Sequence, residues 1–310
     1  MKPFRFGVNV WTARSAGDWL GLARRVEDLG YSTLNLPDHL TTRPAPMPAL
    51  ACAAAATTRL RVGTLVLNND FRHPVLVARE AATLDLLSAG RFELGLGAGY
   101  MKAEYDEAGL RFEPGGVRVE RLAEAVGIIT RLFGGEPITF AGRHYRVTKH
   151  TIHPRPVQHP RPPFLVGGNG PRLLTLAATG ADIVGLSGIT FARGGTVPEL
   201  WGFRASAVDE RIQLVRKAAG PRFDALELNA LVQRVILTED RRGAAEELAQ
   251  RWTALTADDI LASPFALLGS LDEIVAQLIA NRARWGISYY VVFDDVVDAF
   301  APVVERLSGI

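Results

Sequence analysis

Cysteine is nearly absent from this sequence of 310 residues, which contains only Cys52 in the stretch ALACAAAATT. A single thiol cannot form a disulfide within the chain, and this composition is typical of a reducing compartment. We interpret Cys52 as a small buried hydrophobic residue. The composition therefore indicates a cytoplasmic protein.

Long hydrophobic runs and an excess of charge of one sign are also absent. No run of about 18 apolar residues occurs, and MKPFRFGVNV has no apolar core of a signal peptide, so we expect no membrane span and no leader. Basic and acidic residues number 35 and 33, for a net charge of +2, which favours neither nucleic acid nor an anionic membrane. We expect a small-molecule substrate, and the oligomeric state stays open, with a homodimer as one alternative.

Several catalytic motifs are missing. The chain has no G-x-S-x-G, no Cys–His nucleophile pattern and no P-loop. VNVWTARSAG follows the first predicted strand and is not the G-x-G-x-x-G of a doubly wound open sheet, the main rival fold. His144, His150, His153 and His159 lie close together but lack cysteines or carboxylates at ligand spacing, so we expect no metal site.

What the sequence does contain is a regular alternation of β-like runs with amphipathic helical patterns, several of which end in glycine. This order implies parallel strands with right-handed crossovers, and eight units predict one (β/α)₈ TIM barrel domain over residues 1–310. The predicted strands lie at 4–10, 32–36, 60–67, 91–97, 163–168, 181–187, 226–237 and 288–293. The predicted helices lie at 15–30, 74–90, 117–133, 171–180, 198–220 and 270–286.

One connection, between strands four and five, is unusually long, at about residues 100–163. It contains a helical pattern and then ITF and HYRV on either side of AGR, which predict a small hairpin. The proline-rich HPRPVQHPRPP follows as an extended segment. We interpret this connection as an inserted segment that decorates one barrel.

In such a barrel the carboxyl ends of the strands form the active face. Glycine and small polar residues dominate there, and glycine lets the backbone approach a flat ring or a phosphate. The residues at these ends are Asn9, Val10, Trp11, Asp38, His39, Leu67, Asn68, Asn69, Gly97, Ala98, Gly99, Gly167, Gly168, Asn169, Ser187, Gly188, Asp294 and Asp295.

The stretch VGGNGPRLLTLAA is the clearest candidate for binding an anion. Its glycines follow a strand, and Pro171 suits the first position of a helix. Free N–H groups and the helix dipole would then face an anion. A tight turn that needs glycine for its geometry alone would have the same sequence, and the residues leave both interpretations open.

His39 is the only histidine at a predicted strand end, where it could exchange a proton near neutral pH. A structural hydrogen bond among Asp38, His39 and the loop is the alternative, but the position at the active face favours proton transfer. The acids of MKAEYDEAG are expected to form a solvated helix face.

Three stretches resemble the bacterial luciferase-like family, and most closely its branch that uses the deazaflavin coenzyme F420. They are LPDHL, RLRVGTLVLNNDFRHPVLVAREAATLDLLSAGRFELGLGAGY and PFLVGGNGPRLLTLAATGADIV. The resemblance extends from about Phe4 to Val303. It implies a luciferase-like barrel with the deazaflavin lying across the strand ends.

The resemblance also implies cofactor contacts. Asp38 and His39 match an Asp-His pair beside the deazaflavin ring. Leu65 and Val66 match a bulge, often with a cis peptide not involving proline, against one ring face. Gly97, Ala98 and Gly99 match a turn that contacts both the ring and the tail. Gly167, Gly168 and Asn169 match a turn that contacts the phosphate tail.

Two departures bear on the substrate. The glucose-6-phosphate dehydrogenase branch has a glutamate where this chain has Tyr100, and a phosphate-binding lysine where this chain offers only Arg193. These two departures argue against a sugar phosphate as the substrate.

These observations predict an oxidoreductase that transfers a hydride between F420 and a small organic substrate, with His39 as the catalytic proton donor or acceptor. The first alternative is an FMN-dependent monooxygenase that uses dioxygen on the same barrel. The second is a non-catalytic cofactor-binding barrel, against which His39 argues.

Overall fold

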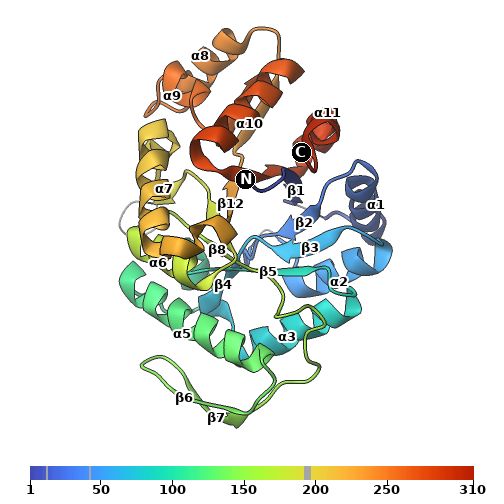
Figure 1. Ribbon diagram of the computed structural model, residues 1–310, viewed down its shortest axis with the longest axis vertical. Coiled ribbons are helices and arrows are strands. Elements are labelled where there is room, and N and C mark those ends of the chain that lie inside the picture. Colours follow the sequence, from blue (N-terminus) through green and yellow to red (C-terminus); the bar gives the residue numbers. More distant parts are fainter. Residues whose placement is uncertain (12, 42, 192–196) are drawn as a thin grey trace.

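Eight parallel strands close into a barrel in the computed structural model, which describes residues 1–11, 13–41, 43–191 and 197–310 (Figure 1). The last strand pairs with the first, and this confirms the predicted barrel. In order around the barrel the strands are β1 (Arg5–Asn9), β2 (Thr33–Leu36), β3 (Arg61–Thr64), β5 (Phe92–Gly97), β8 (Phe164–Gly167), β9 (Ile183–Leu186), β12 (Glu227–Leu231) and β15 (Ile287–Phe293).

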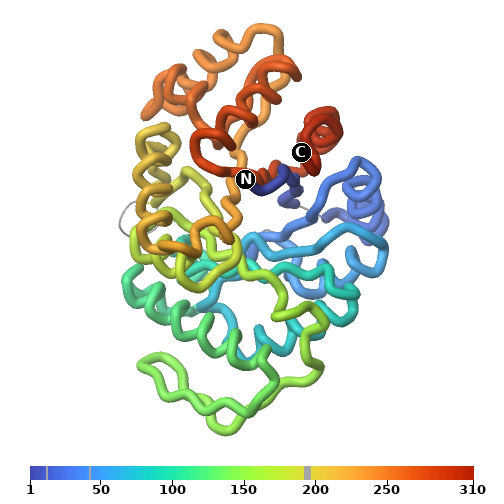
Figure 2. Tube along the Cα trace, in the orientation of Figure 1, coloured from blue at the N-terminus to red at the C-terminus, as the bar shows by residue number. Residues whose placement is uncertain are grey.

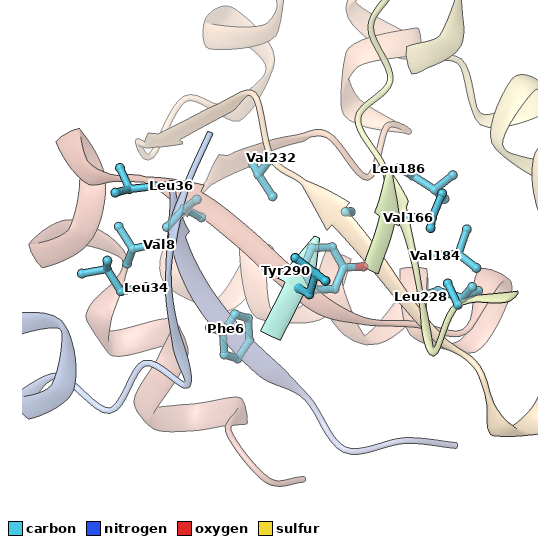
Figure 3. Packing of buried hydrophobic residues seen from close by; sticks show 14 of the residues in the cluster. Phe6, Val8, Leu34, Leu36, Val166, Val184, Leu186, Leu228, Val232 and Tyr290 are labelled. Carbon is cyan, nitrogen blue, oxygen red and sulfur yellow. The ribbon is translucent and has the colours of Figure 1, made fainter. Parts of the chain in front are cut away.

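Residues along each strand alternate between the helix side and the barrel interior. Phe6 and Val8 of β1 pack outward with side chains of neighbouring strands, as Figure 3 shows. Gly7 lies between them and faces inward, because a Cβ there would lie 2.2 Å from Thr33 Oγ1. Strands buried on both faces explain why the β-like runs are so apolar.

Helices cover the outside of the barrel, and Figure 2 shows the two chain ends close together at β1 and α11. There the backbone N–H of Phe4 donates to the carbonyl of Ile310 at 3.1 Å. The covering helices are α1 (Ala16–Asp28), α2 (Pro46–Ala56), α3 (Pro74–Leu87), α5 (Gly115–Phe133), α6 (Pro171–Gly180), α7 (Ala205–Ala219), α10 (Leu271–Trp285) and α11 (Val297–Leu307).

Helix α10 shows how the sequence sets these boundaries. The Ser270 hydroxyl accepts from the Glu273 N–H while the Glu273 carboxylate accepts from the Ser270 N–H, so a capping box begins the helix. Gly286 ends it in the left-handed conformation, at φ 78°. The prediction of a helix at 270–286 is confirmed.

The inserted segment contains the predicted antiparallel hairpin, formed by β6 (Ile138–Ala141) and β7 (Arg146–His150), at one edge of the molecule in Figure 1. A short helix, α4 (Lys102–Glu107), comes earlier in the same connection. Within the described ranges, no helix is long and apolar enough to cross a bilayer.

The predicted strand at 226–237 is wrong in its second half. The Val232 N–H still donates to Val291 of the barrel, but the Gln233 N–H donates to Phe265 outside it. The chain therefore leaves the barrel and forms β13 (Arg234–Leu237), which pairs with β14 (Ala266–Gly269) beside α8 (Arg241–Arg251) and α9 (Ala257–Leu261).

The third predicted strand, at 60–67, is also divided. β3 ends at Thr64, and β4 (Leu67–Asn68) resumes pairing beside β5. The peptide bond between Leu65 and Val66 is cis, which confirms the bulge expected there.

Two further expectations need correction, and one helix was missed. The predicted helix at 198–220 begins only at Ala205, after β11 (Pro198–Glu199), which pairs with β10 (Thr190–Phe191). Helix α2 was not predicted, because its alanine-rich sequence lacks an amphipathic period. Cys52 lies on the outer side of that helix and is exposed, not buried. The remaining elements are short 3₁₀ helices at Asn69–Phe71, Trp201–Phe203, Gly220–Ala225 and Asp294–Val296.

Candidate active site at the carboxyl ends of the strands

His39 follows β2 at the carboxyl face, and its partner is an acid that the sequence did not reveal. Its Nδ1 lies 3.0 Å from Oε1 and 3.2 Å from Oε2 of Glu104, which comes from α4. The Glu104 side chain is only 4% exposed. The expectation that the acids of this segment form a solvated face is therefore wrong for Glu104, although Asp106 and Glu107 are exposed.

Tyr100 lies on the other side of the His39 ring. Its hydroxyl is 3.4 Å from Nε2, and the two rings meet edge to face with centroids 5.8 Å apart. Burial and then the nearby Glu104 carboxylate raise the pKa of Tyr100 to about 12, so the phenol keeps its proton near neutral pH. The Tyr100 ring also stacks on Phe191, with a centroid separation of 4.3 Å.

Asp38 is buried next to His39 and makes ionic contacts of its own. Its carboxylate forms an ion pair with both terminal nitrogens of Arg72 and accepts a hydrogen bond of 3.1 Å from the Asn68 N–H. These contacts tie the end of β2 to β4 and to the segment after it. Asp38 therefore acts as a brace, and its predicted contact with a cofactor ring stays a prediction.

The bulge explains two of the strand-end glycines. A Cβ on Gly97 would lie 2.5 Å from Val66 Cγ2, and one on Gly167 would lie 3.2 Å from Val66 Cγ1. The Val66 side chain thus occupies the space that side chains of β5 and β8 would otherwise fill. Leu65 and Val66 remain partly exposed at the face, where a flat ring could rest on them.

Gly99 has a different reason to be glycine. Its φ is +71°, and an added Cβ would lie 2.1 Å from the Tyr105 hydroxyl. Ala98 precedes it and is partly buried against the core. The two residues continue the turn after β5 that leads into α4.

The turn after β8 leads directly into α6, as predicted. Pro171 is the first residue of the helix, and Gly170 occupies the N-cap without a side-chain hydrogen bond. The Asn169 amide donates to the Ser187 hydroxyl at 3.1 Å and to the Ile189 carbonyl at 2.6 Å. Its Oδ1 is buried and has no hydrogen-bond partner among the residues that the structure describes.

A second aromatic group lies at the ends of β1 and β15. The Trp11 ring stacks on Phe293 at 5.3 Å, and Arg43 Cζ lies 3.4 Å from the Trp11 ring centroid. Asp294 accepts the Trp11 N–H at 3.1 Å, and burial raises the pKa of its carboxyl. A cavity of about 170 Å³ opens beside Trp11 and Phe293.

Sequence reasoning missed Glu104, Arg72 and Arg43, because nothing in their local pattern separates them from solvated charges. A usable signal for Glu104 was its place in a short segment directly after a strand of the active face. Arg193, named as the only cation after the sixth predicted strand, lies outside the described residues.

Comparison with known proteins gives a consistent result. The family model described as luciferase-like monooxygenase matches residues 2–289. An F420-dependent glucose-6-phosphate dehydrogenase from Nakamurella multipartita is 31% identical, over 94% of this chain and 84% of its own length. A 5,10-methylenetetrahydromethanopterin reductase from Methanopyrus kandleri is 25% identical, over 97% and 86%.

A solved structure extends this comparison to three dimensions. The F420-dependent secondary alcohol dehydrogenase in complex with an F420-acetone adduct matches with a TM-score of 0.77 at 19% identity, over 99% of both chains. At that identity the likeness concerns the barrel fold.

Proposed function

This chain belongs to the luciferase-like monooxygenase family, and we propose that it is a coenzyme F420-dependent oxidoreductase acting on a small organic substrate. A bound deazaflavin supplies the hydride acceptor or donor, and the chain supplies binding, orientation and the proton. The relative named an F420-dependent dehydrogenase, which is similar over nearly the whole chain, supports this proposal.

The residues present fit such a cofactor. Leu65 and Val66 offer a partly exposed apolar surface for one ring face. The uncapped N-terminus of α6 offers backbone N–H groups and the positive end of its dipole to a phosphate-bearing tail. The buried, unpaired Oδ1 of Asn169 offers an acceptor to a hydroxyl group of the cofactor chain.

One observation carries the assignment of an enzyme rather than a cofactor-binding barrel without catalysis. His39 stands at the active face with Nδ1 held by a buried carboxylate, while Nε2 has, among the residues that the structure describes, only the long 3.4 Å contact with the Tyr100 hydroxyl. A ring held in this way is suited to exchange a proton with substrate at Nε2.

The single, exposed cysteine is consistent with a cytoplasmic location.

Cofactor titration tests the proposal. Purified chain is added to oxidised F420 and, in a parallel series, FMN is titrated under the same conditions, each followed by its fluorescence. We expect the lower dissociation constant for F420. Tighter binding of FMN would replace the proposal by an FMN-dependent monooxygenase. If the chain binds neither cofactor, the proposal of an F420-dependent enzyme is refuted.

A further inference from the structure

We propose that Glu104 is a positioning residue. Its carboxylate keeps Nδ1 of His39 protonated and hydrogen-bonded, so that Nε2 is the only ring atom that exchanges a proton with substrate. This inference deepens the proposed function and rests on it for its catalytic meaning. The contact itself concerns two residues of the chain and is testable without any cofactor.

The position of the Glu104 carboxylate is well determined. Besides the two contacts to His39 Nδ1, Oε1 accepts the backbone N–H of Leu40 at 3.0 Å, so the carboxylate holds both His39 and the residue after it. The next residue of α4, Tyr105, is fully buried, and its hydroxyl donates to Asn68 Oδ1 at 3.0 Å. The short helix is therefore anchored to the barrel at the acid and at the residue that follows it.

The chemistry of the two groups then determines where the protons of the ring lie. An ionised carboxylate only accepts hydrogen bonds, so Nδ1 must carry the proton of that contact. This holds whether the His39 ring is neutral or charged, since the charged ring differs only in carrying a second proton on Nε2. The proton that moves during the reaction is therefore the one on Nε2.

The neighbour of Nε2 supports the same assignment. The Tyr100 hydroxyl, 3.4 Å away, keeps its own proton near neutral pH, as a phenol does even at its ordinary pKa of about 10. It therefore acts as a neutral donor to an unprotonated Nε2, or as an acceptor from a protonated one, without titrating itself. A substrate oxygen that replaces this long contact would meet Nε2 directly.

Nitrogen-15 NMR of the histidine rings tests the inference on the protein without cofactor. The sequence has six histidines, and a His39→Gln variant identifies the signals of His39 by their loss. We expect one His39 tautomer, protonated at Nδ1, wherever the ring is neutral. A wild-type ring protonated at Nε2 instead, or a mixture of both tautomers, would overturn the proposal.

Two variants make the test specific. In Glu104→Gln an amide can either accept from or donate to Nδ1, so we expect both tautomers of His39 to become populated. Glu107→Gln removes an equal charge from an exposed position of the same helix and should leave the tautomer unchanged. A single unchanged tautomer in a folded Glu104→Gln would contradict the proposal. If that variant does not fold, the wild-type spectrum still decides.

The catalytic consequence has a separate measurement. In Glu104→Gln loaded with F420, turnover should lose part of the ~10²–10⁴-fold that a positioned acid–base group contributes, while the F420 dissociation constant changes less than twofold. Unchanged turnover would mean that the contact is structural only. Failure of the chain to bind F420 would instead refute the proposed function and leave the tautomer result standing.

Discussion

The setting of His39 shows how much one residue depends on contacts that are distant in sequence. Its partner Glu104 lies 65 positions later, and the Tyr100 hydroxyl lies 61 positions later. Both come from the connection after β5. Asp38, its neighbour in sequence, instead makes an ion pair with Arg72. The two residues of the Asp-His pair therefore have different roles, one in the brace and one at the open face.

Replacing His39 by Ala should remove the proton partner and leave the rest of the site in place. We expect turnover to fall by ~10²–10⁴-fold, since acid–base groups contribute on that scale. The F420 dissociation constant should change much less, because the tail would be held at α6. The measurements are deazaflavin absorbance during a screen of small alcohols and carbonyl compounds, and fluorescence titration for binding. Turnover close to wild type would end the proton-transfer role, and lost binding together with a lowered melting temperature would show a structural one.

At the scale of elements, two local features shape the site. The bulge between β3 and β4 places Val66 against Gly97 of β5 and Gly167 of β8, so packing between strands requires glycine at the first position and leaves little room for a side chain at the second. The start of α6 is different, because an added Cβ at Gly170 would meet nothing within 4 Å. Packing therefore leaves the N-terminus of this helix open, as an anion site requires.

Gly170 allows a sharper test of the phosphate-tail prediction than Gly168, where a Cβ would lie 2.1 Å from Leu173 Cδ2. Gly170→Asp and Gly170→Ser both supply a good N-cap, so neither should lower the melting temperature. Only the aspartate places a negative charge where the cofactor phosphate would bind. We expect F420 affinity to fall at least tenfold, about 1.4 kcal/mol, in Gly170→Asp and clearly less in Gly170→Ser. Equal affinity for the two variants would show that the turn holds no anion.

At the scale of the whole molecule, the barrel separates stability from chemistry. At the amino ends of the strands, opposite the site, Arg5 and Arg61 surround the buried Glu93, with Arg5 Nη1 2.9 Å from Glu93 Oε1. Arg5 also contacts Glu227 at 2.6 Å. The network joins β1, β3, β5 and β12. It thereby fastens strands from different parts of the chain at the closed end of the barrel.

The charge of Glu93 predicts how stability depends on pH. Burial alone would raise its pKa, but the Arg5 and Arg61 guanidiniums lower it below the ordinary value of 4.5. A lowered folded-state pKa contributes stability that is complete above about pH 4.5 and is lost as the pH falls through the lowered value. The melting temperature of the wild type should therefore drop on acidification below pH 4.5.

Glu93→Gln should be destabilised by about 3–5 kcal/mol at neutral pH, because it takes the carboxylate away from Arg61 and leaves Arg5 with Glu227 alone. Its disadvantage should shrink as the pH falls, since the wild type loses the same charge. Glu239→Gln, at an exposed position, serves as the control and should follow the wild type. Melting temperatures from pH 3 to 7 decide the matter, and a constant difference between Glu93→Gln and wild type would contradict the argument.

The sequence by itself determined the order of the barrel strands and of most helices that cover them. Apolar periodicity reports which face of a segment is buried, and this is a local property, so the eight barrel strands and helices such as 171–180 could be predicted. The resemblance added the bulge at Leu65 and Val66, which the structure confirms. The turn at α6 has the predicted form, and its role in binding a phosphate stays a prediction.

Only the tertiary structure decided which side chains meet. Closure of the barrel brings the ends of β2 and β5 to one face, and this places Glu104 on His39. The hydrogen bond of the Gln233 N–H to Phe265, outside the barrel and also distant in sequence, likewise ends β12 early. Contacts of this kind depend on the distance between segments far apart in the chain, and no local pattern of hydrophobicity or charge encodes that distance.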